Sequence, residues 1–408
     1  MQVVCRRRPH TKSRHGCLQC KKKRTKCDEG KPSCNRCART GAACSFLAQN
    51  CSLVVITASH SKLAQKSNKV NAKAFSKTHK NQGLDNDART SSNKVLVEMN
   101  FTAAERHRFR LMNHYLNFTY QSLTKLTLNN ADGVWIWRAF VPQLAFEHEF
   151  LLEALLGLSS LHLALSQPYR QSESIEHAVQ HYDKALALGR PHLSNITEYQ
   201  INALFVFSFV VTGYSLGIHR IFPSQVGPLV KINEIMTLLR GASMIANLGS
   251  QWLDQTPLIS LKRPHETEYT QSLSPELEDI LAQLSKRINT TIGTAAGRQA
   301  YINAIALVRH SFLLAISGQS VQKTMALFPI LIDMEFLAMV HLGEPLALTI
   351  LAHYGVILYW LRGHVWLEGW GKLTLDAVRQ ALPTNWHVCI AWALQEVGDG
   401  QAERSLKV

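Results

Sequence analysis

Apolar residues recur at helical spacing through the last three quarters of the chain, from about Thr102 onward. They repeat every three to four positions over 151–165 and again over 175–186, which is the period of one face of an α-helix. Sustained alternation of apolar and polar residues, the signature of half-buried strands, is not evident. The pattern predicts an all-α domain of stacked helices over residues 101–400.

Local signals indicate where several of these helices begin and end. Thr102-x2-Glu105 and Thr197-x2-Gln200 have the spacing of capping boxes, and Gly189 followed by Pro191 is a typical helix stop. Ser274-Pro275 and Glu344-Pro345 place proline in a first helical turn, where its missing N–H is tolerated. The second of these prolines should open a strongly apolar helix that runs to Leu361.

Residues 199–218 contain no charged side chain and therefore resemble a membrane span. The stretch includes several polar residues and glycines, so it is too polar for a convincing span of about 20 residues. We expect a buried helix and no membrane span. Because Met1 is followed by arginines without an apolar stretch, no secretory signal is evident, and the cysteines should meet a reducing compartment.

The positive charge is concentrated at the amino end. The chain has 408 residues and a formal net charge of +15. Residues 1–46 hold 13 Lys or Arg against 2 Asp or Glu, and residues 47–100 hold 8 against 3, which leaves 23 against 24 for the rest. Of the nine cysteines, all but Cys389 lie between Cys5 and Cys51. A basic, cysteine-rich head attached to a neutral body is typical of a protein that binds a polyanion such as nucleic acid.

Six of these cysteines form an internal repeat. Cys-x2-Cys-x6-Cys occurs twice, with six residues between the copies, at Cys17, Cys20, Cys27, Cys34, Cys37 and Cys44. Paired Cys-x2-Cys steps place two thiolates on one tetrahedral metal, and thiolates favour zinc. Six sulfurs complete two tetrahedra only if two of them bridge. The spacing therefore predicts a binuclear cluster with two zinc ions, which a module of this size needs for folding.

The segment from Cys17 to Cys37 resembles the fungal-type six-cysteine binuclear zinc cluster transcription factors, with every cysteine in register. The resemblance implies a DNA-binding domain over residues 10–47, in which Cys17 and Cys34 bridge the metals. Cys20 and Cys27 would then complete one site, and Cys37 and Cys44 the other. Pro32 matches the family's loop proline. Cys5 and Cys51 fall outside the pattern and should be free thiols.

The basic residues of the head divide into two roles. We expect the segment after Cys20 to be helical, and the resemblance implies that Lys23 and Arg24 read bases of double-stranded DNA in a G/C-rich triplet such as CGG. Other cations should contact phosphate or steer DNA, without sequence choice, namely Arg14, Lys21, Lys22, Lys26, Lys31 and Arg36. The early arginine run also resembles a nuclear import signal, so we expect a nuclear protein.

Residues 48–100 are rich in Ser, Asn, Lys and Thr and contain few apolar residues. They keep no sustained heptad, so the pattern predicts a flexible basic linker and no coiled coil. Because many members of the resembled family dimerise through a coiled coil at this place, the oligomeric state stays open.

The body resembles the regulatory domain of fungal sterol-uptake-control regulators. The likeness is carried by short segments, among them Leu151–Leu165, Leu238–Gly241 and Trp366–Gly371. It implies control of activity by a sterol or other apolar ligand. For late tryptophans such as Trp386, and for His162 among its leucines, a role in the core is nevertheless the favoured interpretation. An alternative is a scaffold for coactivator or corepressor proteins.

An enzyme with a zinc appendage is a weaker alternative. Glu147-His148-Glu149 is not a zinc-protease pattern, and the body has neither a nucleophile elbow nor a phosphate-binding glycine loop. We therefore expect a transcription regulator without catalytic residues. General binding of RNA or phosphate by the basic head is a further alternative, which predicts no preferred DNA motif.

Overall fold

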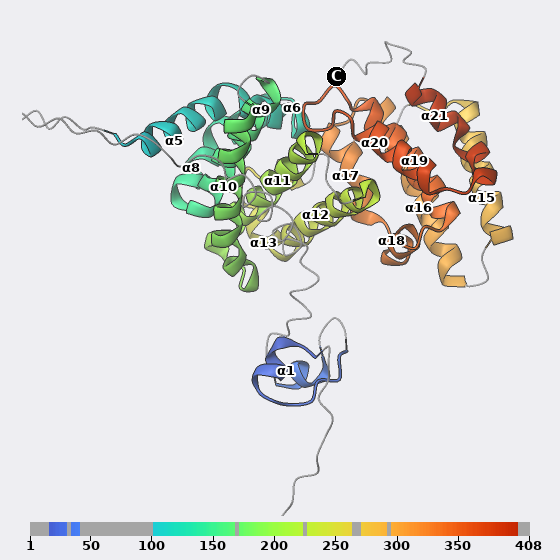
Figure 1. Cartoon of the computed structure of the whole chain (residues 1–408), viewed down its shortest axis with the longest axis horizontal. Coiled ribbons are helices and arrows are strands. Elements are labelled where there is room, and N and C mark those ends of the chain that lie inside the picture. Colours follow the sequence, from blue (N-terminus) through green and yellow to red (C-terminus); the bar gives the residue numbers. More distant parts are fainter. Residues whose placement is uncertain are drawn as a thin grey trace, which may run out of the picture.

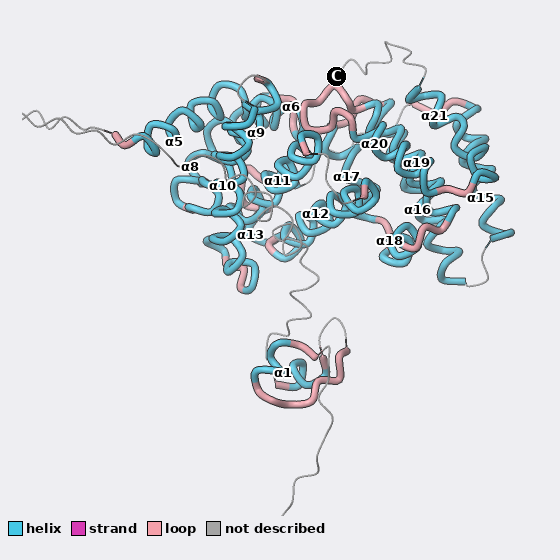
Figure 2. The backbone as a smooth tube through the Cα atoms, in the orientation of Figure 1, coloured by secondary structure: helices cyan, strands magenta, loops and turns pink. Residues whose placement is uncertain are grey.

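The computed structural model describes residues 16–30, 34–40, 101–167, 171–222, 227–262, 271–291 and 295–398. Two five-residue helices form the described part of the head, α1 (Leu18–Lys22) and α2 (Asn35–Arg39). The body is helical, and no strand occurs in any of the described ranges (Figure 2). This confirms the predicted fold class of a small zinc module and an all-α body.

The first half of the body, from Ala103 to Leu248, begins with short helices and ends with long ones. The elements are α5 (Ala103–His114), the π-helix η2 (Tyr115–Thr119), α6 (Tyr120–Thr127), α7 (Ala131–Trp135), the π-helix η3 (Ile136–Phe140), α8 (Val141–Glu147), α9 (Glu149–Ser166), α10 (Gln171–Gly189), the 3-10 helix η5 (Arg190–Ser194), α11 (Glu198–Ile221) and α12 (Pro228–Leu248).

The second half completes the bundle with further helices. They are α13 (Ser250–Leu253), α14 (Ile259–Lys262), α15 (Pro275–Thr291), α16 (Ala295–Ile316), α17 (Val321–Leu331), α18 (Met334–His341), α19 (Pro345–Trp360), α20 (Trp370–Ala381), the 3-10 helix η6 (Thr384–Ile390) and α21 (Ala391–Gly398).

Helix α11 lies at the centre of the body (Figure 1). It packs against α9 on one side and α12 on the other, while α10 covers α9 and α12 in turn contacts α17 and α20. At the far end α19 packs against α20 and α16. One continuous apolar core, which includes Tyr115, Phe207, Phe312 and Trp366, runs through these layers.

Three described helices are long and apolar enough to cross a membrane by length and composition alone. They are α9, α11 and residues 297–316 of α16, and the bent pair α17 and α18 passes the same test as a fourth. Within the bundle, 89% of the apolar window of α11 is buried, against 67% for α9 and 50% for α16. Burial between α9 and α12 accounts for the uncharged stretch of α11.

Several predicted helix ends are confirmed. Glu105 N–H donates to Thr102 Oγ1 (3.2 Å) and Thr102 N–H donates to Glu105 Oε2 (2.8 Å), so the first capping box is complete. Helix α10 ends at Gly189, and α15 and α19 begin at Pro275 and Pro345.

The capping box predicted at Thr197 is wrong. Thr197 precedes α11 but makes no side-chain cap, and the Gln200 side chain pairs with His192 Nδ1 of η5 (2.8 Å). A tertiary hydrogen bond thus replaces the local one that the spacing suggested.

Candidate metal centre and DNA-contacting surface

Five of the six predicted zinc ligands lie together at the centre of the head. Cys17, Cys20, Cys27, Cys34 and Cys37 are each at most 3% exposed, and they alone make up the buried apolar cluster of the described head. A module whose interior consists of thiols has no hydrocarbon core to hold it together. Its fold therefore depends on what those sulfurs bind.

The distances between sulfur atoms match a tetrahedral zinc–thiolate cluster. Cys17 Sγ lies 3.7 Å from Cys34 Sγ and 3.6 Å from Cys37 Sγ, and Cys20 Sγ lies 3.8 Å from Cys34 Sγ. A zinc tetrahedron with bonds of about 2.3 Å has an S–S edge of about 3.8 Å. Cys17, Cys20, Cys27 and Cys34 also have all four sulfurs within 4.8 Å of one another.

Cys17 and Cys34 occupy equivalent places in the two halves of the repeat. Each precedes a short helix, and each sulfur accepts the backbone N–H three residues on, from Cys20 (3.4 Å) and Cys37 (3.5 Å). Because Cys17 approaches Cys37 while Cys34 approaches Cys20, both sulfurs touch ligands of both predicted sites. This is the position that a bridging thiolate requires.

The surroundings of the sulfurs favour a bound cation. Burial raises the pKa of the Cys17 and Cys20 thiols, so their thiolates need compensating positive charge. Backbone N–H groups of Cys17 and Glu29 donate to Cys27 Sγ at 3.4 Å and supply only partial charges. Zinc would provide the remaining positive charge, and a set of thiolate donors fits zinc.

The predicted DNA-contacting side chains lie on the outside of the head. The described cations of this surface are all exposed, namely Lys21, Lys22, Lys23, Arg24, Lys26, Arg36 and Arg39. Lys23 ends α1 as its C-cap, and Arg24 follows with a φ of 51°. The helix thus begins before Cys20 and ends at Lys22, which corrects the expectation of a helix after Cys20. The two predicted base readers project from the turn that leaves the helix.

Four predicted site residues lie outside the described residues, namely Cys44, Arg14, Lys31 and Pro32. The same holds for the linker over 48–100. Asp28, which the sequence analysis passed over, connects the two halves of the head, because Asn35 N–H of α2 donates to its Oδ2 at 3.0 Å. This bond lowers the pKa of the Asp28 carboxyl. An acidic residue seven positions before a helix start gives no recognisable sequence signal.

The body contains an apolar cavity of about 290 Å³ between α6, α11, α12, α13, α14 and α17. Phe205, Phe209, Leu239 and Met325 line its interior. Lys262 also lines the cavity, and its buried ammonium donates to Asp254 Oδ1 (2.7 Å) and to Ser250 Oγ. A largely apolar chamber with a few polar groups in its lining is typical of a small-molecule site.

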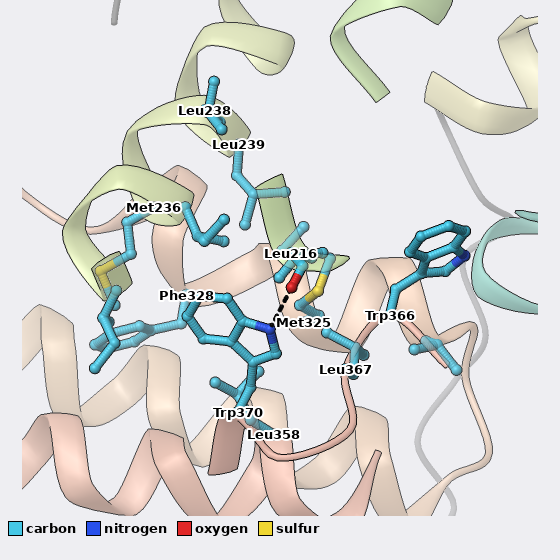
Figure 3. Close-up of a cluster of buried hydrophobic side chains, with 14 of the residues drawn as sticks. Leu216, Met236, Leu238, Leu239, Met325, Phe328, Leu358, Trp366, Leu367 and Trp370 are labelled. Atoms are coloured by element: carbon cyan, nitrogen blue, oxygen red, sulfur yellow. Dashed lines mark hydrogen bonds between the residues drawn. The ribbon is translucent and has the colours of Figure 1, made fainter. Parts of the chain in front are cut away.

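The Trp366–Gly371 segment packs next to this cavity. Trp370 Nε1 donates to the backbone carbonyl of Leu216 (3.1 Å), a residue of α11 that also lines the cavity (Figure 3). Trp366 is buried, and Arg220 of α11 donates to Val365 O and Glu368. Trp366 and Trp370 are thus part of the core, and Trp370 links α20 to α11 beside the cavity, whereas Trp386 is only partly buried and packs against the core.

His162 also has the environment of a core residue. It lies among helices with His114 Nε2 at 3.1 Å and Thr119 Oγ1 at 3.3 Å from its Nδ1. Burial, with His114 adding to it, lowers the pKa of His162 to about 4.

Comparison with known proteins matches both parts of the chain. Residues 15–51 match the fungal Zn(2)-Cys(6) binuclear cluster domain, and residues 110–242 match the fungal specific transcription factor domain. A Zn(2)-C6 fungal-type transcription factor of Gibberella zeae is 24% identical over 410 residues, covering 89% of this chain and 80% of that protein.

Two further relatives are named sterol uptake control protein 2. That of Saccharomyces cerevisiae is 24% identical over 73% of this chain, and that of Candida albicans is 24% identical over 68%. The chain spans only 31% and 39% of these two proteins. With a domain that binds two zinc ions at its head and a fungal transcription factor domain in its body, the chain is a DNA-binding regulator similar to the fungal Zn(2)-C6 transcription factors, which are not enzymes.

Proposed function

We propose that this protein is a nuclear regulator of transcription whose head, residues 10–47, reads a G/C-rich triplet such as CGG. The linker 48–100 would carry the head, and the body 101–400 would control its output. The observation that supports this most directly is the buried sulfur cluster, with edges of 3.6–3.8 Å, beneath an exposed row of lysines and arginines. Bound zinc would fix the fold of the head, and a fixed fold would let its cationic side chains enter a groove of DNA.

The proposed ligand set follows the sulfur contacts. Cys17 and Cys34 bridge the two zinc ions, Cys20 and Cys27 complete the first site, and Cys37 is a ligand of the second. Cys44 is proposed as the remaining ligand from its spacing. Six thiolates and two zinc ions leave a net of −2, so the head keeps a strongly positive charge toward DNA.

Lys23 and Arg24 are the proposed base readers, because they leave α1 together and are exposed beyond its last turn. Arginine or lysine paired with guanine O6 and N7 discriminates against a wrong base by about 1–3 kcal/mol. Exposed cations elsewhere on the head, such as Arg36 of α2, would bind phosphate and add affinity without sequence preference.

A selection from random DNA tests this assignment. The zinc-loaded full chain should enrich a G/C-rich triplet, the Arg24→Ala variant should lose preference at one position of that triplet, and Arg36→Ala should keep the motif and weaken binding to all sequences alike. If the wild-type chain enriches no motif, sequence-specific reading is refuted. If both variants keep the full motif, Arg24 is not a reader.

For the body we propose that the cavity beside α11 takes an apolar ligand, with a sterol as the first candidate because two relatives are named for sterol uptake control. A volume of about 290 Å³ is at the lower end of small-molecule sites, so a full sterol would require movement of flexible lining residues such as Met325. Mass spectrometry of lipids retained by the purified chain tests this directly. If the purified chain retains no lipid and does not bind added sterol, the proposal of a sterol ligand is refuted.

A partner-binding body remains the second candidate, and one observation favours it. Leu331, Met334 and Leu342, on and beside α17 and α18, are 56%, 66% and 76% exposed. Large apolar side chains exposed to solvent at both ends of one helix are consistent with a surface that binds a coactivator or corepressor.

A further inference from the structure

Three histidines lie together at the amino-terminal end of the body, away from the zinc cluster and the apolar cavity. His177 and His181 are one turn apart on α10, and His107 is on α5; both helices pack against α9 (Figure 1). The His107 ring centre lies 3.9 Å from that of His177 and 6.4 Å from that of His181. All three line one open cavity of about 580 Å³.

Two of these imidazoles have buried nitrogen atoms without a hydrogen-bond partner. They are His107 Nε2 and His177 Nδ1. A buried polar atom normally has a hydrogen-bond partner. Two unpaired nitrogens on neighbouring rings of one cavity are therefore candidates for binding a ligand.

The third imidazole, that of His181, makes a hydrogen bond to a carboxylate, as many metal-binding histidines do. His181 Nδ1 lies 2.5 Å from Oε2 of Glu153, whose side chain is fully buried. The same carboxylate is paired with Arg108 and Lys184, so it is the acceptor in the hydrogen bond from His181 Nδ1, and Nε2 is the ring nitrogen left for a metal. Histidines that bind metals commonly donate their second N–H to a carboxylate in this way.

We propose that His107, His177 and His181 form a second metal site, of the class that takes zinc or another divalent transition metal. Two imidazoles on one tetrahedral zinc have ring centres roughly 5 Å apart, given bonds of about 2.0–2.1 Å. The observed 3.9 Å and 6.4 Å lie on either side of this value, so binding a shared ion requires the His107 ring to move away from His177 and toward His181.

Arg110 borders the cavity and repels positive charge on His107, so a bound cation needs nearby carboxylates. The other two cations of the lining, Arg108 and Lys184, are paired with Glu153, and Lys184 also with Glu149 (2.8 Å). Glu173 lies one turn before His177 on the same face of α10, borders the cavity and attracts His107 electrostatically. It is placed to supply the fourth ligand, directly or through water. Bound metal would tie α5, the first helix after the linker, to α10.

Zinc stoichiometry of the full chain tests the site. After loading with zinc and desalting, the wild-type chain should hold one equivalent beyond the two of the cluster, and the double variant His177→Ala/His181→Ala should lack that extra equivalent. The control His341→Ala, which removes an exposed histidine of α18, should keep it. Cobalt substitution separates the two sites, because only the cluster gives thiolate-to-metal charge-transfer bands.

Two outcomes overturn the proposal. One is a wild-type chain that shows the charge-transfer bands of the cluster yet binds no further zinc or cobalt. The other is a double variant that is folded by circular dichroism and still holds the extra equivalent. If the double variant does not fold, His107→Gln, which leaves α10 unchanged, decides by the same measurement.

Discussion

Glu153 is the most strongly constrained charged residue of the body. Its carboxylate is fully buried on α9 and binds Arg108 of α5 together with His181 and Lys184 of α10. A sequence gives no hint of this role, because the partners are 28 to 45 positions away and Glu153 stands in an apolar helical stretch. The zinc ligands, in contrast, follow from spacings of two and six residues. The head site was predictable because its ligands repeat locally in sequence. The cluster around Glu153 was not, because its members come from three helices that only the fold brings together.

Replacing Glu153 with Gln should destabilise the body at neutral pH. The variant leaves three cationic or polarised partners around an uncharged amide, and we expect a loss of about 2–3 kcal/mol, below the ~3–5 of a fully buried pair because Arg108 and Lys184 reach solvent. Urea unfolding followed by circular dichroism at pH 7 measures it. Glu149→Gln, which removes an exposed carboxylate one turn earlier, should change stability by at most about 1 kcal/mol.

The effect of Glu153 should also depend on pH in a definite direction. Its pKa is about 2 in the folded chain against an ordinary value of 4.5, so the carboxylate stabilises the fold fully above about pH 5. Below that pH the unfolded chain binds the proton first, and the stabilisation is lost as pH falls toward 2. The stability gap between wild type and Glu153→Gln should therefore narrow from pH 6 to pH 3. A gap that widens would contradict the assignment.

At the scale of the element, α1 and α2 are too short to persist unaided. Each has five residues, whereas isolated helices below about 12–15 residues are marginal in water. Removal of zinc should therefore melt residues 16–40 and abolish DNA binding, while the helices around α11 keep their protection. Hydrogen exchange with and without a strong chelator checks this. Unchanged protection at α1 would show that the head folds without metal.

The contact of α20 with α19 depends on a glycine. A Cβ added to Gly371 would lie 2.5 Å from Tyr359 Cα, inside the backbone of the neighbouring helix. Gly371→Ala should force the helices apart and destabilise the body by about 1–3 kcal/mol. Gly363→Ala is the matched control, because nothing lies within 4 Å of its added Cβ. Thermal unfolding of the two variants compares them, and equal melting temperatures would argue against close packing at Gly371.

The helices themselves were predictable where one face stays apolar and a cap is local, as at Thr102 and Pro345. The two π-helices of the described body could not be predicted from the sequence. Residues Tyr115–Thr119 and Ile136–Phe140 continue a helical pattern in sequence, and only packing widens the turn. The buried hydroxyl of Tyr115 donates to Trp137 O (2.8 Å), a tertiary contact between the two π-helices that the sequence does not indicate.

For the whole molecule, periodicity predicted an all-α body but could not place its cavity. The lining residues come from six helices between Leu126 and Ile330, and in sequence most of them look like ordinary core positions. The Leu238–Gly241 segment shows the same limit. Its Arg240 donates to the Pro329 and Ile332 carbonyls at the end of α17, a role visible only once α12 and α17 lie side by side.

Filling the cavity should separate ligand control from DNA binding. Ala246 of α12 lines the chamber, and Ala246→Phe would occupy much of its volume, so the variant should lose retention of an apolar ligand while the head still binds its DNA motif. Ala381→Phe adds the same side chain at the exposed end of α20 and should change neither property. Lipid mass spectrometry and DNA-binding assays on the same preparations measure both properties.

Because Leu216 lines the cavity and accepts the hydrogen bond from Trp370, the filled variant should also alter transcriptional output in a reporter assay. A filled chamber that leaves lipid retention and output unchanged would place ligand control elsewhere and favour the exposed surface at α17 and α18.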